Sequence, residues 1–198
     1  MSNSIAAETR GGILIVRFTR PEIRNPLSVE VLESLERIID DGLASASVEK
    51  IVFTGTGNAF ASGADLREIA ALTSENAKEF SLRGQRLMAK IADASKPTIA
   101  AINGFCFGGA LDLALACTHR IASPAATFCH PGAGLGIITG WGGTQRLPRL
   151  IGQANALEMF FTASPIDAEK ALSVGLIDRI SPEPVAESLA KISQSASS

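Results

Sequence analysis

The chain has 198 residues, 46% of them hydrophobic and 19% charged, and its formal net charge is −2. This length and composition are typical of one compact domain and exclude a disordered or repetitive chain. Lys and Arg do not cluster, and no apolar run is long enough to cross a membrane. We therefore expect neither nucleic acid nor a membrane as a partner, and small-molecule chemistry becomes the default.

The three cysteines, Cys106, Cys117 and Cys129, are odd in number and lack metal-ligand spacing. They stand in apolar surroundings, so we interpret them as small buried residues with reduced thiols and expect no metal site. The N-terminal segment MSNSIAAETR lacks the basic and apolar pattern of a signal peptide. Together these observations predict a cytoplasmic protein.

The first part of the chain predicts a hairpin followed by a helix. Residues 5–9 and 13–18 are expected to form two strands joined at Gly11-Gly12. After the loop TRPEIRNPLS, Ser28 is a candidate N-cap for a helix that ends near Gly42. The apolar positions of this helix fall on one face: Val31, Leu32, Leu35, Ile38 and Ile39.

A strand, a glycine-rich loop and a helix then occur twice in succession. Residues 51–54 form an apolar strand that runs into the loop GTGNAFASGADL and a polar helix at about 74–94. Residues 98–103 form the next strand, which runs into segment 104–117. This alternation predicts an α/β fold with a mainly parallel sheet and a ligand crevice at the carboxyl ends of its strands.

The last part of the chain predicts short elements around a second glycine-rich stretch. Strands are expected at 121–123 and 126–129, and helices at 154–161, 168–173 and about 184–192. The stretch HPGAGLGIITGWGGTQRLPRL is too rich in glycine for a regular helix and predicts a long shaped loop. We assign residues 1–181 to the core, and residues 182–198 to a terminal helix and frayed tail of the same domain.

The segment GFCFGGALDLALAC places two glycines at the start of an apolar helix, with Asp112 in its first turn. First-turn amides lack intrahelical acceptors, so an oxygen that gains negative charge could bind at Gly109 and Ala110. Gly108 and Gly109 would let a ligand approach the backbone closely. The alternative is an ordinary turn in which Asp112 only stabilises the helix dipole, as His119 is expected to do at the other end.

Five ordered blocks, which run from residue 20 to residue 180, resemble the crotonase, or enoyl-CoA hydratase/isomerase, superfamily: RPEIRNPLS, AFASGADL, PTIAAINGFCFGGALDLALAC, GWGGTQRLPRLIG and IDAEKALSVGLIDRI. The resemblance implies a ClpP/crotonase-like spiral of ββα units, with helices packed around two roughly perpendicular sheets. It also implies an acyl-CoA thioester substrate, no cofactor beyond the CoA of that substrate, and assembly as a homotrimer or hexamer.

The resemblance further implies that the backbone amides of Ala64 and Gly109 hold the thioester oxygen, while Asp112 is the catalytic acid or base. Substrate contacts are implied for a larger set of residues: Arg24, Asn25, Pro26, Ala61, Gly63, Asp65, Leu66, Gly108, Pro131, Gly132 and Gly140. Two of them have other interpretations. Asp65 is equally a loop-bracing or capping residue, and Arg24 is a solvated charge if it does not meet the CoA phosphates.

The chain departs from the family at its acid and base positions. Hydratases of the family use two glutamates, but Asp112 stands at the first position and is shorter by about 1.5 Å. Gly132 stands at the second position, and Gly140 stands where other members carry an acid. This pattern puts the two-carboxylate hydratase mechanism in doubt.

Other residues are candidates to supply the missing group. His130 is the one imidazole near Gly132 and is either catalytic or a packed structural histidine. A second carboxylate would have to come from Glu158, Glu75 or a neighbouring subunit. Thr139 and Ser62 could donate hydrogen bonds, but the sequence does not single out either of them.

Three functional hypotheses remain open. The leading one is an acyl-CoA enzyme of the enoyl-CoA hydratase/isomerase type, whose reaction is isomerisation, slow hydration or thioester hydrolysis. The second is a catalytically silent CoA-binding or scaffold protein, and the third is a structural assembly subunit. Family members continue beyond the GLIDRI block with several helices, so we expect a pocket that is open or closed by a neighbouring subunit.

Overall fold

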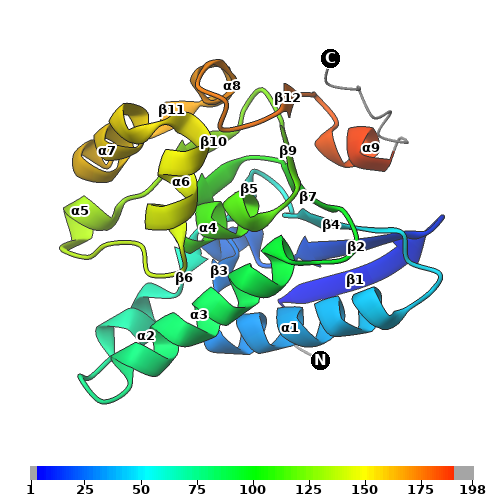
Figure 1. Cartoon of the computed structure of the whole chain (residues 1–198), viewed down its shortest axis with the longest axis horizontal. Coiled ribbons are helices and arrows are strands. Elements are labelled where there is room, and N and C mark those ends of the chain that lie inside the picture. The colour runs from blue at the N-terminus through cyan, green and yellow to red at the C-terminus, as the bar shows by residue number, and fades with distance from the viewer. Residues whose placement is uncertain (1–3, 190–198) are drawn as a thin grey trace.

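The computed structural model describes residues 4–189, and a six-stranded sheet forms its centre (Figure 1). Neighbouring strands follow the order β1 (Ile5–Arg10), β2 (Ile13–Phe18), β4 (Lys50–Thr54), β7 (Thr98–Ile102), β9 (His119–Ala122) and β12 (Arg179–Ile180). The pair β1 and β2 is the predicted antiparallel hairpin, and all other pairs are parallel. The mainly parallel α/β architecture is therefore confirmed.

Two smaller sheets lie beside the first. Strands β11 (Ile166–Asp167), β10 (Thr127–Cys129), β8 (Phe105–Phe107) and β5 (Ala59–Ala61) form one of them, and β3 (Pro26–Leu27) pairs with β6 (Gly63–Ala64) in the other. A short 3-10 helix, η1 (Pro21–Ile23), precedes β3. The β3–β6 pair brings the two sequence blocks around residues 26 and 64 side by side.

The two faces of the six-stranded sheet are covered by different helices. Side chains alternate along a strand, so Leu14 and Val16 belong to one core cluster while Ile13 and Ile15 belong to another. The first face packs against α1 (Val29–Ala44) and α3 (Ala77–Ala92), and the second packs against α9 (Pro184–Leu189) (Figure 1). Both faces are apolar, as buried parallel sheets require.

Helix α1 begins as its sequence predicts. The hydroxyl of Ser28 accepts a hydrogen bond from the amide of Val31 at 3.3 Å and caps the helix. The apolar face buries Leu32, Leu35 and Ile39 in the core. Helix α2 (Leu66–Ala70) is shorter and begins at Asp65, whose carboxylate accepts from the amide of Arg67.

The second glycine-rich stretch contains helices, so the prediction of a continuous loop was wrong. Its glycines confine the loop to the region between α5 (Gly132–Leu135) and α6 (Gly143–Ile151). Helix α6 forms because Leu147 and Ile151 share a face that is buried in the core. Helices α7 (Gln153–Thr162) and α8 (Ala168–Ser173) confirm the predicted elements that follow.

The helix that follows β8, α4 (Gly109–Ala116), is buried along its whole length after the first residue. Asp112 is its one charged residue and is fully buried. The helix ends at Ala116, so the prediction that His119 lies at its C-terminus was wrong. His119 begins β9 instead, because the chain turns at Cys117 and Thr118 to enter the sheet.

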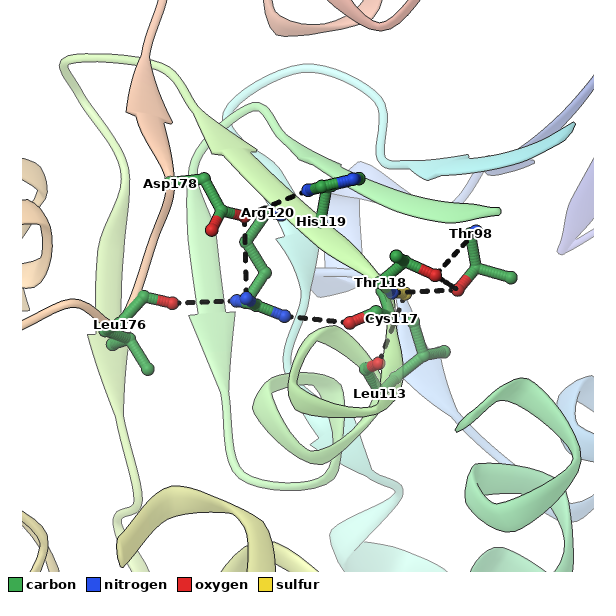
Figure 2. Close-up of polar contacts among 8 residues, drawn as sticks. All are labelled: Thr98, Leu113, Cys117, Thr118, His119, Arg120, Leu176 and Asp178. Atoms are coloured by element: carbon green, nitrogen blue, oxygen red, sulfur yellow. Dashed lines mark hydrogen bonds and ion pairs between the residues drawn. The ribbon is translucent and has the colours of Figure 1, made fainter. Parts of the chain in front are cut away.

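The turn after α4 is tied to the C-terminal part of the chain by Arg120 (Figure 2). Its guanidinium donates to the carbonyl of Leu176 at 2.9 Å and to that of Cys117 at 2.8 Å, and it lies 3.5 Å from Asp178. The Asp178 carboxylate also accepts from the backbone amide of Arg120 at 2.7 Å. Although the Arg120 side chain is buried, its hydrogen bonds replace those it would make with water.

The C-terminal elements complete the described part of the chain. The predicted helix at about 184–192 is present as α9 over Pro184–Leu189, whereas the predicted tail lies outside the described residues. Val185 and Leu189 pack against the second face of the six-stranded sheet. Within residues 4–189, no helix has both the length and the apolar character needed to span a bilayer.

Candidate active site

A cavity of about 250 Å³ opens at the N-terminal end of α4. Helices α2 and α3, strand β6 and the loop around α5 contribute its walls. The residues that the sequence predicted for the site and that line the cavity are Ala64, Leu66, Gly108, Gly109, Asp112, His130, Pro131, Gly132 and Gly140. Residues from the two glycine-rich loops, far apart in the sequence, therefore meet at one place.

The backbone amides of Ala64 and Gly109 lie at the same end of this cavity. The first intrahelical bond of α4 runs from the amide of Asp112 to the carbonyl of Gly108 at 3.0 Å, so the Gly109 amide precedes the helical ladder. A Cβ atom on Gly63 would lie 2.6 Å from the nitrogen of Gly109. Glycine at position 63 thus allows β6 to approach the start of α4, and the two amides become neighbours.

Trp141 closes one wall of the cavity against Gly109. A Cβ atom on Gly109 would lie 2.4 Å from the Trp141 ring, and a Cβ atom on Gly84 of α3 would lie 2.2 Å from it. The buried ring thus sits between α3 and α4, in contact with Phe80 at a centroid distance of 5.8 Å. No sequence signal predicts this role of Trp141, because the residues that meet at its ring come from separate elements.

Asp112 points its carboxylate from the first turn of α4 into the buried end of the cavity. The hydroxyl of Thr139 donates to Oδ2, while Oδ1 has no hydrogen-bond partner. Burial raises the pKa of Asp112 to about 6, and the hydrogen bond from Thr139 opposes this rise. A carboxylate with such a pKa is mostly ionised at neutral pH yet accepts a proton readily.

His130 faces the unpaired oxygen of Asp112. Its Nε2 lies 3.7 Å from Oδ1, and neither ring nitrogen has a hydrogen-bond partner. The ring is 3% exposed, and burial lowers the pKa of His130 to about 4. The imidazole is therefore neutral at neutral pH. The other face of the ring meets Phe160 at a centroid distance of 5.1 Å.

Gly143, the first residue of α6, provides the room for this group of side chains. A Cβ atom there would lie 2.1 Å from Oδ1 of Asp112, 2.8 Å from Thr139 and 3.0 Å from the His130 ring. Three polar side chains and one glycine therefore converge on a single point. Thr139 is the member of this group for which the sequence offered no reason.

Gly132 has no space for an acidic side chain in this conformation. Its carbonyl accepts from the amide of Ile137 at 3.0 Å, and a Cβ atom on it would lie 2.5 Å from the Ile137 carbonyl oxygen. Gly140 lines the same cavity, and its carbonyl accepts from the side-chain amide of Gln85 at 2.8 Å. Among residues 4–189, Asp112 is the only carboxylate that lines the cavity, and Glu75 and Glu158 do not reach it.

The remaining predicted substrate contacts lie behind the cavity wall. Ala61 is buried in β5, and Pro26 pairs with Gly63 between β3 and β6. The side chain of Asn25 is buried, and its hydrogen bonds are made within the protein. It donates to the carbonyls of Ala59 and Phe60 and accepts from the backbone amide of Arg20. This bracing explains why Asn25 adopts a positive φ of 52°.

Two charged residues on this side of the molecule have other partners. Asp65 caps α2 and forms an ion pair with Arg67 at 2.6 Å, so the capping interpretation of Asp65 describes its structure. Arg67 lowers the pKa of the Asp65 carboxyl through this hydrogen bond. Arg24 is exposed and lies 4.9 Å above the ring of Phe105, which holds it near the loop without burying its charge.

A second cavity of about 280 Å³ adjoins the first. It is lined mainly by apolar residues of α5, α7 and the loop between α5 and α6, among them Ile138, Leu157 and Phe161. His130 and Thr139 line both cavities, so the polar group around Asp112 borders the apolar second cavity as well as the first.

The sheet layers, the glycine-flanked start of α4 and the buried carboxylate beside it define the class of crotonase-fold proteins. The chain belongs to the enoyl-CoA hydratase/isomerase family, whose model matches residues 8–195. The short-chain-enoyl-CoA hydratase of Clostridium acetobutylicum is 36% identical over 90% of this chain and 69% of its own length. The crotonyl-CoA hydratase of Syntrophomonas wolfei is also 36% identical, over 96% and 74%.

Solved structures agree with these sequence relatives. The enoyl-CoA hydratase of Bacillus anthracis superimposes with a TM-score of 0.88 at 34% identity, over 94% of this chain and 73% of that one. DspI of Pseudomonas aeruginosa gives a TM-score of 0.89 at 32% identity, over 96% and 78%. The resemblance to the crotonase superfamily is thereby confirmed, and the fold it implies with it.

Proposed function

We propose that the protein is an enoyl-CoA hydratase/isomerase-type enzyme that works with Asp112 as its one carboxylate. The observation that carries this proposal is the position of Asp112, which is buried in the first turn of α4 within the cavity that Ala64 and Gly109 also line. The hydratase names of the relatives support the substrate class, a 2-enoyl thioester of CoA.

In the proposed hydration, Asp112 first removes a proton from a water molecule. The water oxygen bonds to the β-carbon, the carbon–carbon double bond opens, and its electron pair moves through the α-carbon to the thioester oxygen. The amides of Ala64 and Gly109 hold that oxygen while it is negative, a role in which one donor contributes about 3 kcal/mol. The carbonyl then re-forms, and the α-carbon takes the proton from Asp112.

The same carboxylate also serves a double-bond shift. There it removes a proton from the α-carbon of a 3-enoyl thioester and returns it to the γ-carbon, so that the double bond moves to the 2-position. Neither the hydration nor the double-bond shift needs a second carboxylate, which agrees with the closed turn at Gly132. Neither needs a cofactor, because CoA enters as part of the substrate.

Arg24 is proposed to attract the CoA phosphates from outside the cavity. It is exposed, the neighbouring Glu22 pairs with Arg20 instead, and the ring of Phe105 orients it. Leu66, which is exposed on the cavity wall, is proposed to contact the pantetheine part of CoA. Both contacts would add binding without taking part in proton transfer.

We also propose a homotrimer or hexamer in the cytoplasm. The exposed apolar side chains of Ile138 and Phe161 support burial by a neighbouring subunit, and the three free buried cysteines support a reducing compartment. Light scattering on the purified protein tests the assembly, and cell fractionation tests the compartment.

The experiment for the activity is a comparison of three substrates. Purified protein is incubated with crotonyl-CoA, a 3-enoyl-CoA and a saturated acyl-CoA, and the products are separated by liquid chromatography. We expect 3-hydroxyacyl-CoA from the first and 2-enoyl-CoA from the second. Release of free CoA from the third would favour a hydrolase instead. Calorimetric binding without turnover of any substrate would favour a silent CoA-binding protein and would overturn the proposal.

A further inference from the structure

The pair formed by Asp112 and His130 contains most of the unpaired buried side-chain nitrogen and oxygen atoms in the described part of the chain. Five such atoms occur there: Thr54 Oγ1, Asp112 Oδ1, Ser123 Oγ, His130 Nδ1 and His130 Nε2. Three of the five belong to this pair, and two of them face each other across 3.7 Å. Buried polar groups without partners cost free energy, so such a concentration in one cavity indicates a function.

His130 is the side chain that faces the unpaired oxygen of Asp112, while the backbone amides of Trp141 and Gly143 also act on the carboxylate and lower its pKa. Thr139 already donates to the other oxygen, Oδ2. A shift of about 0.8 Å would bring Nε2 of His130 within a normal hydrogen bond of Oδ1. Packing against Phe160 keeps the ring at this position without occupying either nitrogen.

The charges around the pair favour a neutral imidazole that donates. Arg146 of α6 is the cation that acts on Asp112, and Cys106 of β8 is a buried neutral thiol nearby. A neutral imidazole carries one N–H and one lone pair. If the proton is on Nε2, it meets the carboxylate; if it is on Nδ1, a lone pair faces a negative oxygen. The Nε2–H tautomer is therefore favoured.

We propose that neutral His130 donates its Nε2–H to Oδ1 of Asp112, and so positions this carboxylate and keeps it ionised when substrate fills the cavity. The inference rests on the proposed function. A bound thioester expels water and makes a charged carboxylate more costly, and a fixed donor offsets that cost. His130 is thus a positioning residue that acts through Asp112, and it compensates for a site that has one acid instead of two.

Kinetics with two variants separate this role from packing. His130→Gln retains an amide donor near the position of Nε2, whereas His130→Leu fills similar space without a donor. For His130→Leu we expect kcat to fall about tenfold with KM changed less than about twofold, and the acid limb of the kcat–pH profile to move up by about one unit. His130→Gln should stay within about threefold of the parent, with its acid limb in place.

Equal losses of kcat in the two variants, or an acid limb that stays in place in His130→Leu, would overturn the proposal. A second measurement does not depend on turnover or on the folding of a His130 variant. The chain has only two histidines, so the imidazole ¹⁵N resonances of His130 are readily assigned.

In the unmodified protein, His130 should show a protonated Nε2 from pH 5 to pH 8. Its Nε2 resonance should also shift in one step as Asp112 titrates, and this step should be absent in Asp112→Asn. A protonated Nδ1, or no step, contradicts the inference. If no acyl-CoA is turned over but the step is present, the proposed function fails while the hydrogen bond stands.

Discussion

Helix α4 connects two buried polar clusters that differ in how completely they are hydrogen-bonded. At its C-terminal end, Arg120 donates to two carbonyls and pairs with Asp178 (Figure 2). At its N-terminal end, Asp112 and His130 lie together with three atoms unpaired. One cluster lies at the start of this eight-residue helix and the other just beyond its end, and residues of other elements complete both, so the helix itself does not explain the difference.

The polar groups of the Arg120 cluster stabilise the fold, whereas those of Asp112 and His130 are available for chemistry. A saturated cluster has no capacity left for a ligand, and its loss exposes carbonyls that were satisfied before. An unsaturated cluster costs stability in the folded state and gains partners only when a ligand arrives. We therefore expect removal of a polar side chain at the Arg120 end to change stability, and removal of one at the Asp112 end to change activity.

The largest expected effect is that of Asp112→Asn on turnover. The amide cannot accept the proton, so kcat for crotonyl-CoA hydration should fall about 10³-fold. The melting temperature should be unchanged or higher at pH 8, because the variant no longer buries a charge. A parallel loss of activity and stability would contradict the separation of the two clusters.

Arg120→Met should give the largest loss of stability. It leaves the carbonyls of Leu176 and Cys117 without their donor, and we expect the free energy of unfolding in urea to fall by about 2–4 kcal/mol. Arg179→Met is the matched control, since Arg179 is 65% exposed and should cost less than about 0.5 kcal/mol. Folded Arg120→Met should retain its kcat within about twofold.

Gly143→Ala tests whether the arrangement of Asp112, Thr139 and His130 depends on the absence of a side chain at position 143. The added methyl group would meet Asp112, Thr139 and His130, so we expect a loss of about 1–3 kcal/mol in stability together with reduced kcat. Gly134→Ala is the control, because nothing lies within 4 Å of a Cβ atom there. If the two variants behave alike in melting and turnover assays, close packing at Gly143 is not what positions Asp112.

The smallest expected effect is the dependence of kcat and of stability on pH in the unsubstituted protein. Asp112 acts as a base, and its pKa is raised to about 6, so kcat should fall about tenfold for each unit below that pH. The pKa of Asp112 in the folded protein lies above the usual 3.8 of an aspartate, so Asp112 contributes a loss of stability as the pH rises from about 4 to about 6. Asp112→Asn should lack this contribution in unfolding measured across the same range. A rate independent of pH between 5 and 7 would exclude Asp112 as the titrating base.

The elements that the sequence predicted correctly depend on local signals. Three features were predicted from residues that are close together in the sequence: the hairpin at Gly11-Gly12, the Ser28 cap and the alternation of strands with glycine loops. Helix α6 was not predicted because the glycines before it disfavour a helix. Its stability comes from the burial of Leu147 and Ile151, which depends on tertiary packing. His119 was misplaced because a buried helix gives little sign of where it ends.

The candidate site was predictable only in part for a related reason. Asp112 and Gly109 stand in one motif, so their proximity follows from the helix. Thr139 lies 27 residues from Asp112 in the sequence, and the fold of the α5–α6 loop alone brings them together. The closed turn at Gly132 likewise depends on Ile137, so the absence of an acid was visible in the sequence while the absence of room for one was not.

Trp141 makes the cavity observable without any label. It is the single tryptophan of a chain that has no tyrosine, and its ring lies against Gly109 on the cavity wall. Intrinsic fluorescence therefore arises from one indole placed beside the amide that is proposed to hold the thioester oxygen. Titration with a CoA thioester should change the emission of this indole directly, and stopped-flow mixing would follow the filling of the cavity in real time.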